Sequence, residues 1–196
     1  MRGTTPRPVI DLSFPHRWQA EVLEARPLIL PARRFVYPRE AEEVERGALE
    51  VLVRPEGDDR QIFLATCALG FRDPAVPTGL WSAPKPEELC AVSGGYAYLI
   101  DTARPERFTM IAYRPVLEIL PAVAEGLLLY VGHRSIMAWG RDGQAWESEK
   151  LSDEGLTITG ADNGVLRGKG WEMRKDEEIS FALDLATGSR LPPLSQ

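Results

Sequence analysis

The sequence has few of the residues that build catalytic and metal centres. Of its 196 residues, two are histidine and two are cysteine. Cys67 and Cys90 lie 23 positions apart, which fits neither a disulfide framework nor a CxxC redox or zinc motif. We therefore expect two buried thiols that pack as small apolar side chains in a reducing cytoplasm. We expect no metal site and no cofactor.

An excess of positive charge and long apolar runs are also missing. Lys and Arg number 23 against 29 Asp and Glu, a formal charge of -6. This balance is unfavourable for binding a phosphate backbone or an anionic leaflet, and no run approaches the ~20 apolar residues that span a bilayer. We expect a soluble protein with neither a nucleic-acid nor a membrane partner. Residues 1–15 lack the apolar stretch of an export signal and predict an extended N-terminal arm.

Familiar catalytic motifs are absent as well. There is no HExxH and no GxSxG, and the spacing of Gly164, Gly168 and Gly170 fits neither a phosphate loop nor a dinucleotide fingerprint. The glycines of Ser93-Gly94-Gly95 predict a bulge or tight turn. His133 follows a predicted strand, where a catalytic base could lie, but a structural role in the turn is favoured. The sequence therefore identifies no catalytic residue.

The remaining composition is that of one globular domain, with 44% hydrophobic and 27% charged residues. Sixteen prolines interrupt the chain and disfavour long helices, whereas apolar and period-two segments indicate strands. We predict strands at Trp18–Leu23, Leu49–Arg54, Gln61–Leu69, Tyr96–Ile100, Phe108–Tyr113, Leu127–Val131, Ser135–Trp139, Gly155–Gly160, Val165–Gly168 and Ile179–Leu185. Pro38–Gly47 is the best helix candidate. The prediction is a single all-β domain over residues 1–196 with one or two short helical turns.

Turn signals in the C-terminal half indicate hairpins at Asp142-Gly143 and Asn163-Gly164. The segment Phe181–Gly188 resembles the outer hairpin of a quinoprotein-type propeller blade, and Leu127–Trp146 resembles the strands and turn of another. A closed propeller needs at least about four blades of about 40 residues, and the first 90 residues lack that spacing. We therefore favour an antiparallel sandwich or an open stack of blade-like sheets. The wider stretch from Cys90 to Trp171 also resembles an uncharacterised family of short all-β bacterial proteins, which implies no activity.

Two regions are candidate binding surfaces. Residues 71–89 are rich in proline around Trp81 and predict a long irregular loop. In the C-terminal half we expect three tryptophans to gather near one edge of the sheets; each is more often a core residue than a ligand platform. The candidate binding residues are Trp81, His133, Arg134, Trp139, Trp146 and Trp171.

Acidic residues form two clusters, one at Glu147, Glu149, Asp153 and Glu154 and the other at Glu172, Asp176, Glu177 and Glu178. Solvated loops are the simplest interpretation, and an acidic surface that binds a basic partner is the sharper one. We therefore predict a non-catalytic interaction protein; an acidic immunity-type protein is one specific form. The alternative is a carbohydrate-binding protein or hydrolase that uses scattered carboxylates and a tryptophan platform. A homodimer through exposed sheet edges is a further hypothesis.

Overall fold

The computed structural model describes residues 7–39, 46–57 and 59–192. It is almost entirely β, with 51% of residues in strands, and its four mostly antiparallel sheets do not close into a barrel. The described residues contain one helical turn, the 3-10 turn η1 (Asp59–Gln61). These features confirm the predicted fold class. The helix candidate Pro38–Gly47 lies mostly outside the described residues.

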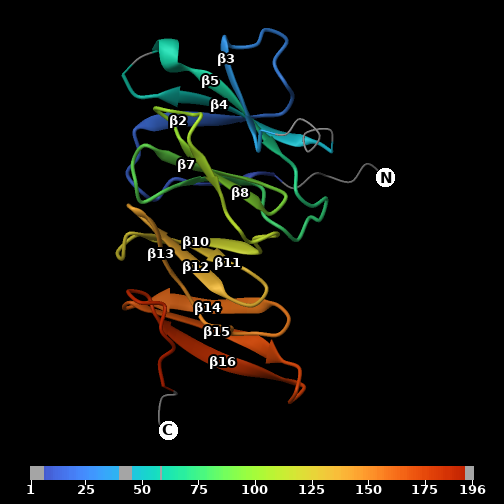
Figure 1. Cartoon of the computed structure of the whole chain (residues 1–196), viewed down its shortest axis with the longest axis vertical. Coiled ribbons are helices and arrows are strands. Elements are labelled where there is room, and N and C mark those ends of the chain that lie inside the picture. The colour runs from blue at the N-terminus through green and yellow to red at the C-terminus, as the bar shows by residue number, and fades with distance from the viewer. Residues whose placement is uncertain (1–6, 40–45, 58, 193–196) are drawn as a thin grey trace. The chain divides into compact units, whose positions relative to one another are not determined.

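The chain forms two compact units, residues 1–115 and residues 116–196, coloured from blue to yellow-green and from yellow to red (Figure 1). We call them unit 1 and unit 2 and describe each by itself. A single domain over residues 1–196 would require the two units to unfold together, so it stays a prediction.

Unit 1 contains two sheets. The first has the order β2-β4-β5-β3 and consists of β2 (Trp18–Leu23), β4 (Ala48–Pro55), β5 (Phe63–Ala68) and β3 (Arg33–Tyr37). The second has the order β1-β6-β7-β8-β9 and consists of β1 (Val9–Asp11), β6 (Gly79–Ser82), β7 (Glu88–Ser93), β8 (Tyr96–Asp101) and β9 (Phe108–Met110). The pairs β1–β6 and β3–β5 are parallel, and the other pairs are antiparallel.

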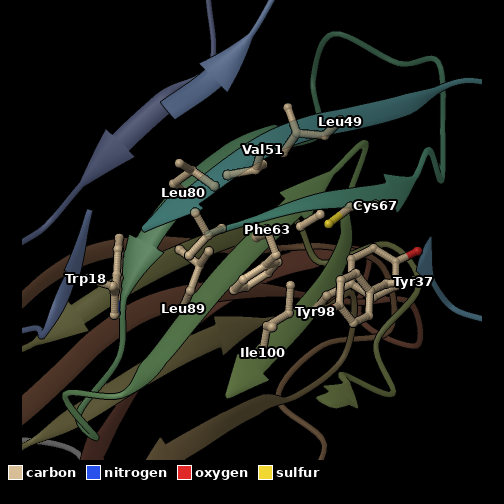
Figure 2. Close-up of a cluster of buried hydrophobic side chains, with 13 residues drawn as sticks. Trp18, Tyr37, Leu49, Val51, Phe63, Cys67, Leu80, Leu89, Tyr98 and Ile100 are labelled. Carbon is tan, nitrogen blue, oxygen red and sulfur yellow. The ribbon is translucent and has the colours of Figure 1, made fainter. Parts of the chain in front are cut away.

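The core of unit 1 lies between these sheets. Figure 2 shows Val51 and Phe63 of the first sheet facing Leu89, Tyr98 and Ile100 of the second. Alternate residues of β4 point into this cluster because successive strand side chains face opposite sides. Cys67 and Cys90 are both free and buried, which confirms the expectation of two buried thiols.

Unit 2 also contains two sheets, each a meander of consecutive antiparallel strands. One consists of β10 (Glu118–Ala122), β11 (Leu127–Val131), β12 (Ile136–Gly140) and β13 (Gly143–Glu147). The other consists of β14 (Leu156–Asp162), β15 (Val165–Glu172) and β16 (Glu177–Asp184). Their facing side chains form one apolar cluster, in which Leu129 and Ile136 come from the first sheet and Leu166 and Phe181 from the second.

Turn chemistry explains several of the hairpins. Asn163 and Gly164 adopt positive φ values of 49° and 75° between β14 and β15, and Gly94 and Gly95 adopt 56° and 75° between β7 and β8. Both turns therefore confirm the predictions. The Asp142-Gly143 prediction was one residue out of register: the turn residues are Arg141 and Asp142, and Gly143 already pairs with Gly140.

Other expectations need larger corrections. The stretch 71–89 is not one long loop, because Gly79–Ser82 forms β6 between β1 and β7 and Glu88 begins β7. Within the predicted extended arm at residues 1–15, Val9–Asp11 forms β1 and pairs with β6; residues 1–6 lie outside the described part. The prolines of 71–89 flank β6 instead of interrupting it, so their number overstated the loop. No helix in the described residues has the length and apolar character to cross a membrane.

Candidate functional site

The six candidate binding residues are divided between the two units. Trp81 on β6 is 3% exposed in unit 1, so it presents no surface for a ligand. Trp146 on β13 is also buried; its indole Nε1 donates to the Leu185 carbonyl at 2.8 Å, and Gly188 leaves no space beside the ring. The Trp81 and Trp146 candidates are thus corrected to packing residues.

The two remaining candidate tryptophans differ from these two. Trp139 on β12 and Trp171 on β15 are half-buried. Trp171 pairs with Glu178, whereas Trp146 contacts the turn that follows β16. Six strand residues at about 3.3 Å each separate these two ends of the β15–β16 hairpin, so Trp146 and Trp171 lie roughly 20 Å apart. The expected gathering of three tryptophans at one edge is therefore wrong.

A groove of about 420 Å³ lies on the outer face of the sheet β14-β15-β16, around Trp171. Leu166 and Gly168 face the core, Gly168 directly beneath the Phe181 ring, so the alternation of β15 puts Lys169 and Trp171 on the opposite face. The groove is lined by Glu154, Gly155, Leu156, Thr157, Lys169, Gly170, Trp171 and Glu178. It combines one aromatic platform with two carboxylates, one ammonium and one hydroxyl.

Ser152 fixes the backbone of Trp171. Its buried hydroxyl accepts from the Trp171 amide at 2.8 Å and donates to the Trp171 carbonyl at 3.2 Å. The Asp153 amide donates to the same carbonyl at 2.7 Å, and the Glu154 amide donates to Ser152 Oγ at 3.1 Å. A Cβ on Gly170 would lie 2.4 Å from the Leu151 carbonyl, so glycine permits this close approach. The connection before β14 therefore positions both Trp171 and Glu154.

The same connection brings Arg134 close to this region. The Arg134 carbonyl accepts from the amides of Leu151 and Ser152 at 2.7 and 3.3 Å. The Asp153 carboxylate accepts from Lys150 Nζ and, at 2.9 Å, from the Met173 amide. These two hydrogen bonds lower the pKa of Asp153, and the charges of Lys150 and Arg134 lower it further. Arg134 and its neighbour His133 are exposed in the turn between β11 and β12.

Charge is distributed unevenly along the chain. Residues 1–115 contain 15 Lys and Arg and 16 Asp and Glu, whereas residues 116–196 contain 8 and 13. The net charges are therefore -1 and -5, which sum to the -6 of the whole chain. Within the groove, Lys169 Nζ lies 3.2 Å from Glu178 Oε2. Glu154 is exposed and forms no ion pair with any residue that the structure describes.

Lys169, Thr157 and Ser152 are site residues that sequence reasoning missed. The signal for Lys169 was the alternation Leu166, Gly168, Gly170 against Arg167, Lys169, Trp171, which predicts one polar face carrying a tryptophan. Ser152 left no such signal, because its role depends on contacts 19 residues away. Across residues 7–39, 46–57 and 59–192, no three His, Cys, Asp or Glu side chains are grouped so that they could hold a metal ion.

Comparison with known proteins adds no assignment. The sequence matches no protein-family model, and a search of curated proteins returns no match. Function must therefore be inferred from the groove itself.

Proposed function

We propose that the protein is a non-catalytic binding protein whose unit 2 presents the Trp171 groove to a basic partner. The observation that supports this most directly is that Trp171, Glu154 and Glu178 line one groove, in the unit with a net charge of -5. An acidic immunity-type protein that blocks a basic toxin or nuclease is a specific form of this proposal. A cytoplasmic location is part of it, and two free buried thiols fit a reducing compartment.

The groove suits a cationic side chain. An arginine guanidinium or lysine ammonium over the Trp171 indole would gain cation–π attraction, and the Glu154 carboxylate could accept its hydrogen bonds. Lys169 already pairs with Glu178, so an incoming cation would compete with Lys169 for that carboxylate. Such an exchange keeps Glu178 paired in both states and makes binding sensitive to salt.

An arginine-rich peptide titrated into the full-length protein tests this proposal, with tryptophan fluorescence as the signal. The control peptide replaces each arginine with glutamate. We expect Glu154→Gln to weaken binding by about three- to fivefold, and Trp171→Phe to remove most of the fluorescence change. Glu125→Gln, in the exposed turn between β10 and β11, removes the same charge outside the groove and should have less effect.

Equal weakening by Glu125→Gln and Glu154→Gln would show that total charge decides binding and would remove the groove from the proposal. Absence of binding at low salt would reject a cation-recognising surface. Capture from a lysate of the native host, with wild type and Glu154→Gln as paired baits at low and high salt, then identifies the partner. A basic protein that only the wild type retains, and that high salt releases, is the expected result.

A carbohydrate is the second candidate ligand, because Trp171 with two carboxylates and the Thr157 hydroxyl also resembles a sugar-stacking surface. The two candidates differ in salt dependence. A neutral oligosaccharide should bind equally well at low and high salt and should be lost in Trp171→Phe. Hydrolysis of that sugar, abolished in Glu154→Gln or Glu178→Gln, would turn the proposal toward a glycosidase.

A homodimer through sheet edges is a separate part of the proposal, and β14 is the edge that favours it. β14 pairs only with β15 in its sheet, whereas the C-terminal half of β16 is covered by a bridge between Leu183 and Arg190. The bulge between Ile158 and Gly160 shortens the regular part of that edge. Sedimentation of the wild type and of Ala161→Pro, a change near the end of β14, tests it; a monomer at all concentrations would reject the dimer.

A further inference from the structure

The connection between β2 and β3 contains the most exposed apolar side chains among the described residues. β2 and β3 are opposite edges of the sheet β2-β4-β5-β3, so residues 24–32 connect one edge of the sheet to the other. We call this segment, the blue loop leading into β3 in Figure 1, the crossing loop. It is held at both ends. Arg26 lies 4.0 Å from Glu50, which accepts from Thr66 at 2.7 Å, and Arg33 donates to the Gln61 carbonyl at 2.9 Å.

Leu28 and Ile29 occupy the tip of the crossing loop and are 104% and 89% exposed. They lie between Pro27 and Pro31, which restrict the backbone on both sides. Single exposed apolar residues are ordinary on protein surfaces, but two adjacent aliphatic side chains with almost no contact to the fold gain nothing from folding. Their burial therefore requires a second surface.

The segment that carries this tip has a net positive charge, opposite to that of the chain, although the Glu50 carboxylate offsets Arg26. Residues 24–34 contain Arg26, Arg33 and Arg34 against the single acid Glu24, whereas the whole chain has a net charge of -6. Arg34 is exposed, and the Arg33 guanidinium lies 5.5 Å from the centre of the Phe35 ring. The segment thus combines an exposed apolar tip with arginines on both sides of it in the sequence.

Three kinds of occupant could cover such a tip, and the charges distinguish them. A symmetric contact with the same loop of a second copy would bring two arginine sets together, which is unfavourable. A protein groove would have to match the protruding shape of the loop. A lipid bilayer adapts to a convex apolar tip of any shape, and anionic headgroups complement arginines at its base.

We propose that the crossing loop is a peripheral docking element that inserts Leu28 and Ile29 into an anionic phospholipid surface, with Arg33 and Arg34 at the level of the phosphates. The proposal is independent of the Trp171 groove. The sequence analysis expected no membrane partner because the whole chain has a net negative charge. That expectation averaged the charge over the chain, whereas this proposal depends on the positive charge of one segment. Two aliphatic side chains provide little buried area, so the association should be weak, reversible and dependent on anionic lipid.

Flotation of the full-length protein with vesicles tests this inference. One set is pure phosphatidylcholine, and the other contains about one third phosphatidylglycerol at about 0.1 M salt. We expect binding only to the anionic vesicles. The double variant Leu28→Ser with Ile29→Ser should reduce it at least about tenfold, and Arg34→Gln about fivefold, the factor for one basic residue near an anionic surface. Met173→Ser, which removes another exposed apolar side chain, is the matched control and should bind as the wild type does.

A reporter variant measures insertion directly. The emission of Ile29→Trp should shift to shorter wavelength with anionic vesicles and stay unchanged with neutral ones. Equal binding to both vesicle types, no binding to either, or wild-type binding by the double serine variant would overturn the proposal. Self-association without lipid that the double serine variant abolishes would assign the tip to a second copy and would overturn it as well.

Discussion

Units 1 and 2 both pack two sheets around an apolar cluster, but their strands are connected differently. In unit 1, β1 pairs in parallel with β6 and β3 pairs in parallel with β5, so Val9 aligns with Gly79 and Arg33 with Phe63. In unit 2, every sheet pairing joins consecutive strands in antiparallel fashion. Turns therefore specify the pairings of unit 2, whereas contacts between distant segments specify part of unit 1.

The surfaces differ in the same way. Unit 1 is nearly neutral and exposes the apolar tip of the crossing loop, whereas unit 2 has a net charge of -5 and a polar groove around Trp171. The two proposals thus use separate regions: the docking loop needs arginine and aliphatic side chains, and the groove needs carboxylates and an indole. A variant in one region should leave binding by the other unchanged.

The largest effect is expected from truncating a buried aromatic side chain in either core. Phe63 is fully buried in unit 1 and contacts the Phe35 ring edge-on at 5.5 Å between ring centres, and Phe181 packs on Gly168 in unit 2. Phe63→Ala and Phe181→Ala should each cost about 3–5 kcal/mol of unfolding free energy. Since each ring belongs to one cluster, hydrogen exchange should show the greater loss of protection in the unit that carries the substitution.

The outcome also tests the prediction of a single domain. If both variants lowered protection equally in residues 1–115 and 116–196, the chain would unfold as one cooperative domain, and the comparison between independent units would fail. Two separate denaturant transitions, each shifted by one variant, would support it.

The next effect tests the long-range pairing of unit 1. A Cβ on Gly79 would lie 1.9 Å from the Val9 carbonyl, so Gly79→Ala must push β1 away from β6. We expect a loss of about 1–3 kcal/mol and rapid amide exchange in residues 9–11. Gly160→Ala on β14 is the control, because nothing lies within 4 Å of its added Cβ. Retained protection of Val9–Asp11 in Gly79→Ala would show that the β1–β6 pair tolerates the methyl group.

The difference in connectivity explains some of the strands that the sequence did not predict. β2 was predicted with its observed bounds, and β11 and the Asn163-Gly164 turn were also predicted, since apolar pattern and turn residues are local signals. The strands β1, β3, β6, β7 and β10 were missed. The partners of β1 and β3 lie about 70 and 30 residues away, so no neighbouring segment shows that they pair. β6, β7 and β10 each pair with a neighbouring strand, but prolines lie in or near them, and these prolines favoured a loop.

The groove was only partly predictable for the same reason. Trp171, Glu154 and Glu178 stood out by residue type, but nothing indicated that they share one face, because the bond between Ser152 and Trp171 spans 19 residues. Trp81 and Trp146 show the opposite case, because the sequence suggested a binding role and the structure shows packing residues. An aromatic near prolines or near a turn is a binding candidate in sequence, and only the packing around it shows that it is buried.

An effect of similar size is expected at the Ser152 contact. Ser152→Ala leaves the amides of Trp171 and Glu154 without their acceptor, which should cost about 1–3 kcal/mol. It should also loosen Trp171 and weaken binding of the arginine-rich peptide. Ser180→Ala is the control, because Ser180 is exposed on β16 of the same sheet. Wild-type stability and peptide affinity in Ser152→Ala would remove Ser152 from the groove.

The smallest effect is a pH dependence confined to unit 2. The hydrogen bonds from Lys150 and the Met173 amide lower the pKa of Asp153 in the folded protein, so the folded state holds that proton less tightly than the unfolded state does. The stabilisation is therefore complete above the ordinary carboxyl pKa of about 4 and is lost as the pH falls through the lower folded value. Asp153→Asn should lower the urea midpoint of unit 2 slightly at about pH 7, and this difference should shrink as the pH falls below about 4. Lys150→Met should lower the midpoint similarly, and in its presence Asp153→Asn should have less effect, because the partner that stabilises the carboxylate is gone. A midpoint difference between wild type and Asp153→Asn that does not shrink as the pH falls below about 4 would mean that shape, and not the charge of the carboxylate, gives Asp153 its role.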